Sequence, residues 1–277
     1  MLKFLTKAII FLGVIVGAIT FVYLYDLYQE IKDDIDSVVN YNPKQSTQFF
    51  DKNGKLLANT FKDENREYVN YDDIPARVIE GLVAIEDTQF FEHFGVNPDA
   101  ISRAVIKNIQ SGGYSEGAST LTQQLIKVLL LSREKKIIRK VKEALLAVRL
   151  ETILTKEEIL ERYLNHVYFG HGYYGVKTAA KGYFKKNLYE LTLKEIAILV
   201  GLPRAPSFYD PTKNLQVSLA RANQVITRMH TLGWINNEQF EESINETPTI
   251  YNQTLTQNIA PYAIDYAVSE LVNDIPD

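Results

Sequence analysis

The stretch Ser119-Thr120-Leu121-Thr122-Gln123-Gln124-Leu125-Ile126-Lys127, continued by the apolar run from Val128 to Leu131, decides how the middle of this chain folds. Its spacing predicts a helix over 120–131. Four polar side chains recur at i, i+3, i+4 and i+7 and form one stripe, while the remaining surface is almost entirely apolar. Such a helix is typical of a protein interior, where amide and ammonium groups need polar partners. We therefore expect the stripe to line a polar cleft. The alternative is a stripe that faces solvent beside a core.

Helical patterns also flank this segment. Further helices are expected from Pro75 onward and at about 136–154, 155–168, 192–201 and 217–232. The dipeptide Asn53-Gly54 lies between two short apolar runs and predicts a β-hairpin. No internal repeat and no alternation of strands with helices is visible. The pattern indicates a mainly α fold with a small β element.

The N-terminal part contains an uncharged apolar run from Ala8 to Tyr25, which at about 1.5 Å per residue is long enough to cross a bilayer. Lys3 and Lys7 precede the run and mostly acidic residues follow it, so the positive-inside rule places the N-terminus in the cytoplasm. A cleavable signal peptide is the alternative, but the run is long for one and no Ala-x-Ala site follows. The predicted organisation is a cytoplasmic tail (1–7), a transmembrane helix (8–25), a stalk (26–45), a catalytic domain (46–245) and a C-terminal extension (246–277).

Charge is distributed unevenly along the chain. The whole sequence carries −4 and no cysteine, which argues against a general nucleic-acid binder and excludes disulfides and thiolate metal sites. Between Ser102 and Arg149, however, ten basic residues accompany only three acidic ones, a local charge of +7. This asymmetry predicts a site for an anionic ligand or contact with an anionic membrane surface.

Two groups of residues are candidates for chemistry. Val78, Leu82 and Ile85 share one helix face that leads directly to Glu86. Partial burial can raise the pKa of a carboxyl group at such a position, which is what a general base near neutral pH requires. Arg139 and Glu143 have the spacing of a surface ion pair. Together with Lys127 and Arg103, the same cluster has enough donors for a pyrophosphate. His93 has no metal-ligand companions nearby in sequence, so a structural role is favoured for it.

Five motifs occur in order: E-D-x-x-F-x-x-H-x-G at 86–95, G-A-S-T-L-T-Q-Q at 117–124, R-K-x-x-E at 139–143, I-L-E-x-Y-L-N at 159–165 and R-x-x-x-V at 221–225. In order and spacing they resemble the motifs of the peptidoglycan glycosyltransferases of family 51, which occur alone or as the N-terminal half of class A penicillin-binding proteins. The resemblance covers roughly residues 49–245. It departs slightly at Leu121, where isoleucine is usual, and at Ile226, where leucine is usual.

The resemblance implies a lysozyme-like helical domain that polymerises lipid II at the outer face of the cytoplasmic membrane. The 4-hydroxyl of the acceptor sugar would attack the anomeric carbon of the growing strand, invert it and expel undecaprenyl pyrophosphate. Glu86 would be the general base. Glu143 would lie near the pyrophosphate and position it or a divalent cation, Mg²⁺ or Mn²⁺. Positions that match phosphate- or sugar-binding residues of the family are Arg103, Ser119, Gln123, Gln124, Lys127, Lys140 and Lys142.

The implied partners are lipid II, the growing glycan strand, the membrane and other cell-wall synthesis proteins, with no organic cofactor and no nucleic acid. Residues 128–131, with Ile137 and Ile138, are expected to dip into the bilayer surface and receive the lipid tail. The segment from Ala260 to Asp277 resembles the junction to a transpeptidase domain, which would make the chain a fragment of a bifunctional enzyme. The S-x-x-K match at 132–135 lacks a following K-T-G and is interpreted as coincidence.

Two other functions remain open at this point. A lysozyme-like glycoside hydrolase also uses paired carboxylates, but it has no pyrophosphate to hold and would leave Lys127, Lys140 and Lys142 without a role. A non-enzymatic membrane scaffold would tolerate the substitution Glu86→Gln, whereas an enzyme would not.

Overall fold

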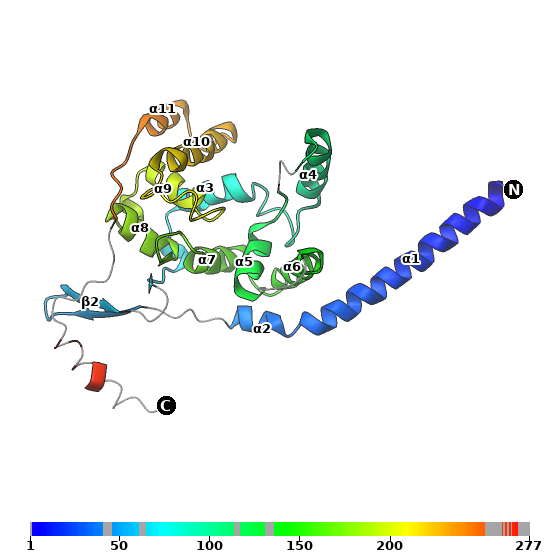
Figure 1. Cartoon of the computed structure of the whole chain (residues 1–277), viewed down its shortest axis with the longest axis horizontal. Coiled ribbons are helices and arrows are strands. Elements are labelled where there is room, and N and C mark those ends of the chain that lie inside the picture. The colour runs from blue at the N-terminus through cyan, green and yellow to red at the C-terminus, as the bar shows by residue number, and fades with distance from the viewer. Residues whose placement is uncertain are drawn as a thin grey trace. The chain divides into compact units, whose positions relative to one another are not determined.

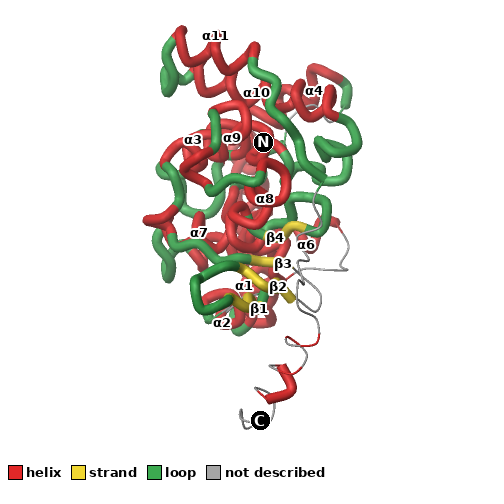
Figure 2. The backbone as a smooth tube through the Cα atoms, turned by 90° about the vertical axis from the view of Figure 1, so that its left-hand side faces the viewer, coloured by secondary structure: helices red, strands yellow, loops and turns green. Residues whose placement is uncertain are grey.

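A computed structural model describes residues 2–40, 46–60, 65–113, 117–130 and 136–252, together with positions 262, 264, 266 and 268–270. Helices dominate this part of the chain and the strands are few and short, which confirms the predicted mainly α fold (Figures 1 and 2). The chain divides into two compact units. The first comprises residues 1–41 and 91–156, and the second comprises residues 42–90 and 157–277. The predicted catalytic domain, 46–245, therefore contributes to both units.

The first unit contains the helices α1 (Leu2–Ile31), α2 (Asp34–Val39), α4 (Pro98–Ser111), α5 (Leu121–Leu130) and α6 (Lys136–Leu150). α2 packs against α5 and α6, and α1 packs against α6. Ile31, Ile35 and Val38 are at most 2% exposed, so this segment is anchored in the core of the unit. Residues 26–31 and 34–39, expected as a stalk, are therefore helical and packed rather than an extended spacer.

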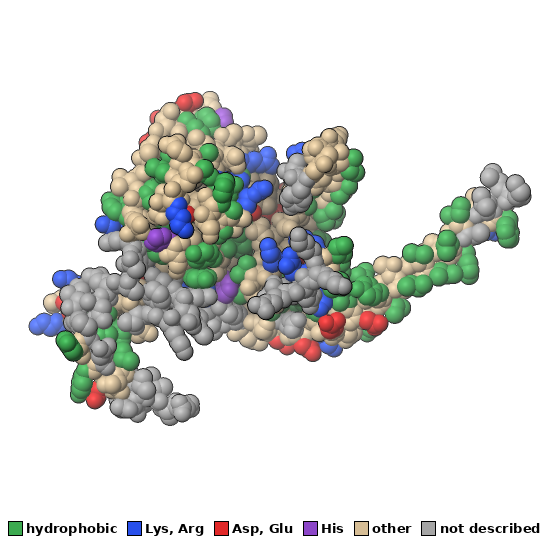
Figure 3. All heavy atoms as spheres, in the orientation of Figure 1, with side chains coloured by type: hydrophobic (Ala, Val, Ile, Leu, Met, Phe, Trp, Pro, Cys, Tyr) green, Lys and Arg blue, Asp and Glu red, His purple; other side chains and the backbone are tan. Residues whose placement is uncertain are grey.

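Among the described residues, α1 is the one helix that is long and apolar enough to cross a membrane. Its apolar segment runs from Ile9 to Ile31 with a mean hydropathy of 2.1, and its most apolar window is not buried by the rest of the protein. Hydrophobic side chains cover α1 along its length (Figure 3). The helix continues beyond Tyr25, the predicted end of the span, because its last turns have a second apolar face that packs into the unit.

The β structure lies in the second unit. β1 (Thr47–Phe50) and β2 (Leu56–Thr60) form the predicted antiparallel hairpin, in which Thr47 is opposite Thr60. In the turn, an Asp51 carboxylate oxygen accepts the backbone N–H groups of Asn53 and Lys55, and Gly54 has a φ of 81°. A second, two-residue sheet pairs β3 (Asn65–Arg66) with β4 (Tyr173–Tyr174) in parallel.

The helices of the second unit are η1 (Tyr71–Asp73), α3 (Ala76–Glu86), α7 (Lys156–His166), α8 (Val176–Phe184), η2 (Leu188–Glu190), α9 (Leu193–Gly201), α10 (Leu215–Thr231) and α11 (Asn237–Asn245). α9 is buried from Lys194 to Gly201 and packs against α3 and α10. The predicted capping box of Thr192 and Glu195 opens it. Residues 246–252 have no regular secondary structure; most of the predicted C-terminal extension, and the S-x-x-K match, lie outside the described residues.

Candidate active site

Glu86 is the last residue of α3. The helix ends there because Asp87 adopts an extended backbone with a φ of −159°. Val78 and Leu82 are fully buried on the same helix, as their spacing predicts. The Glu86 side chain is only 10% exposed, and its Oε1 lies 3.1 Å from Nη2 of Arg221. The candidate base is therefore a nearly buried carboxylate with an arginine partner.

Arg221, on α10, is held from several sides. Its Nη1 donates to Oε1 of Gln224 at 3.1 Å, and its guanidinium lies over the ring of Tyr209, 5.7 Å from the ring centre. Its stem runs past Gly201, where a Cβ would come within 2.9 Å of the Arg221 Cγ. Burial lowers the pKa of Arg221, and the charge of Glu86 opposes that effect. The sequence showed the R-x-x-x-V motif without a role for its arginine. Its position on the face shared with Ser218, Ala222 and Val225 was the available signal.

Tyr163 on α7 completes the described surroundings of Glu86. Its side chain is 1% exposed. Burial, and secondarily the negative charge of Glu86, raise the pKa of Tyr163 well above its usual value. The tyrosine therefore stays neutral beside Glu86.

His93 and Gly95, at the end of the first motif, hold a turn in place. The Nδ1 atom of His93 accepts the backbone N–H of Gly95 at 3.2 Å, and Oγ1 of Thr120 donates to the Gly95 carbonyl at 2.6 Å. A Cβ on Gly95 would come within 2.5 Å of the Ala147 backbone. These contacts place the turn against α6, in agreement with the structural role expected for His93.

The polar stripe predicted on α5 has two parts that differ in burial. Thr120 precedes α5, and its hydroxyl accepts the N–H of Gln123 while the Gln123 amide oxygen accepts the N–H of Thr120, each at 3.1 Å. This is a capping box, T-x-x-Q, that satisfies donors at the helix start. Gln123 is 4% exposed, whereas Gln124 is half-buried and Lys127 is exposed. The cleft itself, and the substrate-binding roles of Gln123, Gln124 and Lys127, stay predictions.

Ser119, Lys140 and Glu143 lie together in the first unit. Nζ of Lys140 lies 2.7 Å from the Ser119 hydroxyl oxygen and 2.6 Å from Oε2 of Glu143. Nε of Arg139 lies 3.4 Å from the other oxygen, Oε1. Glu143 is 2% exposed, whereas the Lys140 side chain is 49% exposed. We call Ser119, Arg139, Lys140 and Glu143 the cationic cluster; it presents an ammonium and a hydroxyl at the surface over a buried carboxylate.

Two other predicted ligands lie apart from the cationic cluster. Lys142 is 6% exposed and its Nζ lies 3.1 Å from Oε1 of Glu30, at the end of α1. Arg103 is exposed on α4. Lys142 thus pairs with α1.

An open apolar groove of about 710 Å³ adjoins the cationic cluster. It is lined by Leu24 of α1 and by Ile137, Lys140, Val141, Ala144 and Leu145 of α6. Among the lining residues that the structure describes, Lys140 is the charged one. Leu24 lies within the apolar segment of α1, so the groove begins on the helix that is suited to lie in the bilayer. The cluster and groove together can hold a ligand with an anionic head and an apolar tail.

A divalent cation bound by protein side chains does not fit these residues. Both oxygens of Glu143 face cationic groups, and among the described residues no group of three His, Cys, Asp or Glu side chains could hold a metal. Mg²⁺ and Mn²⁺ prefer several oxygen ligands. We therefore assign no step of the chemistry to a metal.

Residues 53–230 match the transglycosylase family. The match includes Glu86, Arg221 and all four residues of the cationic cluster. The chain belongs to this family. It is similar to penicillin-binding protein 1A of Aquifex aeolicus, with 39% identity over 95% of this chain and 36% of the relative. It is also similar to penicillin-binding protein 1A of Escherichia coli, with 38% identity over 90% of this chain and 30% of the relative.

Penicillin-binding protein 1F of Bacillus subtilis is 40% identical over 70% of this chain and 27% of its own length. A crystal structure of penicillin-binding protein 1A from Haemophilus influenzae is 26% identical, covers 85% of this chain and 25% of that chain, and has a TM-score of 0.46. The chain therefore spans about a third of the length of the first two relatives. It carries a transglycosylase domain homologous to theirs, and a lysozyme-like hydrolase is not favoured.

Proposed function

We propose that this chain polymerises lipid II into glycan strands. The observation that carries the proposal is the position of Lys140, which belongs to the cationic cluster and also lines the apolar groove that begins on α1. A polyprenyl pyrophosphate has this combination of a charged head and an apolar tail. A hydrolase of finished glycan would have no use for either feature.

The proposed reaction is an inverting displacement. Glu86 takes the proton from the 4-hydroxyl of the acceptor sugar while that oxygen forms a bond to the donor anomeric carbon. The bond from this carbon to the phosphate oxygen breaks, and its electron pair leaves on undecaprenyl pyrophosphate. The leaving group needs charge compensation rather than a proton, because pyrophosphate is already a stable anion. Lys140 and Arg139 supply positive charge for this purpose.

The apolar groove would receive the first units of the lipid tail. Ile137 is 81% exposed beside it, and Val128 and Ile138 are 48% and 36% exposed. These side chains agree with the expectation that this part of the first unit enters the bilayer surface; Leu131 lies outside the described residues. Ile137→Asn should raise the KM for lipid II and leave kcat nearly unchanged. Unaltered kinetics and unaltered membrane partition would contradict this role.

The proposed location is the outer face of the cytoplasmic membrane, with the N-terminus inside. Lys3 and Lys7 lie on one side of the apolar segment, and acidic residues follow it. Lipid II, the growing glycan strand, the membrane and other cell-wall synthesis proteins are the proposed partners.

The test is a polymerisation assay on labelled lipid II with the whole chain in detergent or vesicles. Wild type should form glycan strands, moenomycin should inhibit it, and Glu86→Gln should lower kcat by about 10²-fold or more, because it removes the general base. Finished glycan offered to the same protein should stay intact. Cleavage of that glycan without polymerisation would support a hydrolase, and full activity of Glu86→Gln would support a scaffold.

A further inference from the structure

The Glu86 side chain is nearly buried, yet a general base must be ionised. A carboxylate that is 10% exposed loses most of its hydration, and burial on its own favours the protonated form. A protonated carboxyl group cannot accept the proton of a sugar hydroxyl. A cation in contact with a buried carboxylate favours its ionised form.

Arg221 is the charged group placed to do this. Its Nη2 lies 3.1 Å from Glu86 Oε1, and it is itself only 5% exposed. The other groups around the pair are Tyr163 from α7, Arg204 and Tyr209 from the segment after α9, and Gln224 on α10. Tyr163 is neutral, and Arg204 acts on Arg221 by repulsion. Arg221 is therefore a cation in direct contact with the Glu86 carboxylate.

The orientation of Arg221 is set by its neighbours and not by Glu86 alone. Gln224 accepts from Nη1, the Tyr209 ring lies under the guanidinium, and Gly201 leaves room for the stem. With Nη1 engaged by Gln224, one face on the Tyr209 ring and the stem confined at Gly201, the planar guanidinium directs Nη2 toward Glu86. These contacts therefore hold the Arg221 guanidinium in place without a bound substrate.

We propose that Arg221 is the positioning residue of the general base: it holds the Glu86 carboxylate ionised and directs it toward the acceptor hydroxyl. The inference rests on the proposed function, in which Glu86 receives that proton. It assigns to Arg221 no contact with the pyrophosphate.

The experiment measures kcat and KM for lipid II against pH with the whole chain. Arg221→Gln should lower kcat by about 10²-fold at neutral pH. It should also move the acid limb of the kcat profile upward by about one pH unit or more, because the positive charge that favoured the carboxylate is gone. The KM should stay close to wild type. Arg221→Lys keeps the positive charge but loses the planar guanidinium that fixes the direction of the contact. Its acid limb should therefore stay near that of wild type while kcat falls.

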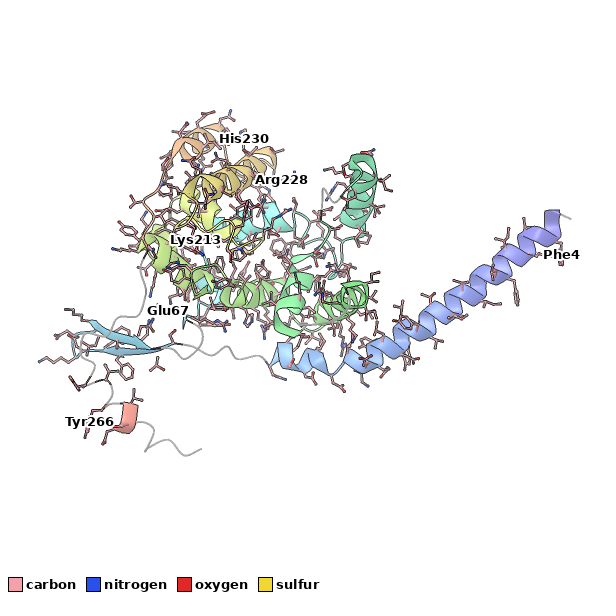
Figure 4. The ribbon with its side chains drawn as sticks, viewed as in Figure 1. Phe4, Glu67, Lys213, Arg228, His230 and Tyr266 are labelled. Atoms are coloured by element: carbon pink, nitrogen blue, oxygen red, sulfur yellow. The ribbon has the colours of Figure 1, made fainter. Side chains whose placement is uncertain are left out.

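Two further variants complete the design. Arg228→Gln is the matched control. Arg228, labelled in Figure 4, lies about two turns further along α10, is exposed, and donates to Thr88 at 3.1 Å. It should leave the acid limb in place. Gly201→Ala displaces the Arg221 stem without altering any charge, and should lower kcat as Arg221→Lys does.

The possible outcomes distinguish a failure of the role of Arg221 from a failure of the proposed polymerisation of lipid II. A wild-type chain that makes no polymer would overturn both. Polymerisation by wild type with an acid limb that stays fixed in Arg221→Gln would overturn the inference alone. So would a raised KM at unchanged kcat, which would make Arg221 a substrate ligand, or a lowered melting temperature as the sole effect. If Arg221→Gln does not fold, Arg221→Lys and Gly201→Ala decide: a lowered kcat with KM and acid limb unchanged supports the inference, and an unchanged kcat or a raised KM overturns it.

Discussion

Lys142 on α6 donates to Glu30 near the end of α1, with Nζ 3.1 Å from Oε1. The lysine is 6% exposed and the glutamate is 66% exposed. The pair fixes the helix that carries the apolar span to the helix that carries Glu143. It explains why a lysine from the most basic part of the sequence is buried rather than presented to a ligand.

Lys142→Met should therefore act first on stability. Glu30 stays hydrated after the substitution, so we expect a loss of about 1 kcal/mol, typical of a pair with one exposed partner. That loss corresponds to a melting temperature lower by about 2–4 °C. Amide hydrogen exchange at residues 27–31 should become faster, because the last turn of α1 loses its anchor. A raised KM for lipid II with unchanged stability would instead show that Lys142 is chiefly a ligand of the pyrophosphate.

Lys140→Met should act on binding. Lys140 is the half-exposed ammonium of the cationic cluster, and one charge-assisted hydrogen bond contributes about 1.5–3 kcal/mol. We expect the KM for lipid II and the Kd for moenomycin to rise by about 10- to 100-fold. Lys142→Met, two residues along the same helix, is the matched control. Equal effects of the two substitutions on the Kd would contradict the separation that the structure makes between these lysines.

The regular elements were predictable from the sequence because their signals are local. The apolar face of Val78 and Leu82, the turn before Gly54 and the capping box at Thr192 each depend on a few neighbouring residues. The helical, packed state of residues 26–40, the predicted stalk, was not predictable because their acidic residues mask a sparse apolar face, Ile31, Ile35 and Val38. That face is recognisable only once α5 and α6 are present to cover it.

Site residues that belong to a sequence motif were predictable, whereas contacts between residues far apart in the sequence were not. Ser119, Lys140 and Glu143 come together as the motifs suggested. The ion pair of Glu86 with Arg221 joins residues 135 positions apart, and no local pattern indicates it. The role of Gln123 in capping α5 was hidden by its place on an apparently continuous polar stripe, because the helix begins one residue later than expected.

Gly95→Ala should destabilise the first unit strongly. Gly95 has a φ of 86°, and a Cβ there would come within 2.5 Å of the Ala147 carbonyl carbon and oxygen. Backbone strain of about 1–2 kcal/mol adds to an overpacking cost of about 1–3 kcal/mol. Gly112→Ala is the control, since its φ of 65° imposes similar strain while no atom lies within 4 Å of the added Cβ. Chemical denaturation should show a loss about twice as large at Gly95. Similar losses at both positions would mean that the turn moves away from α6 at little cost.

His166 should make the stability of the second unit depend on pH. Burial, together with the nearby charge of Arg66, lowers the pKa of His166 to about 4 from its usual 6.5. Between these two values the unfolded chain binds more protons than the folded one, so the free energy of unfolding falls as the pH falls. The contribution is complete above pH 6.5 and is lost as the pH approaches 4. His166→Gln removes the titrating group, so the drop in unfolding free energy between pH 7 and pH 4.5 should be smaller in the variant than in wild type. Urea denaturation at both pH values measures it, and an identical drop in the two proteins would show that His166 is protonated without cost in the folded state.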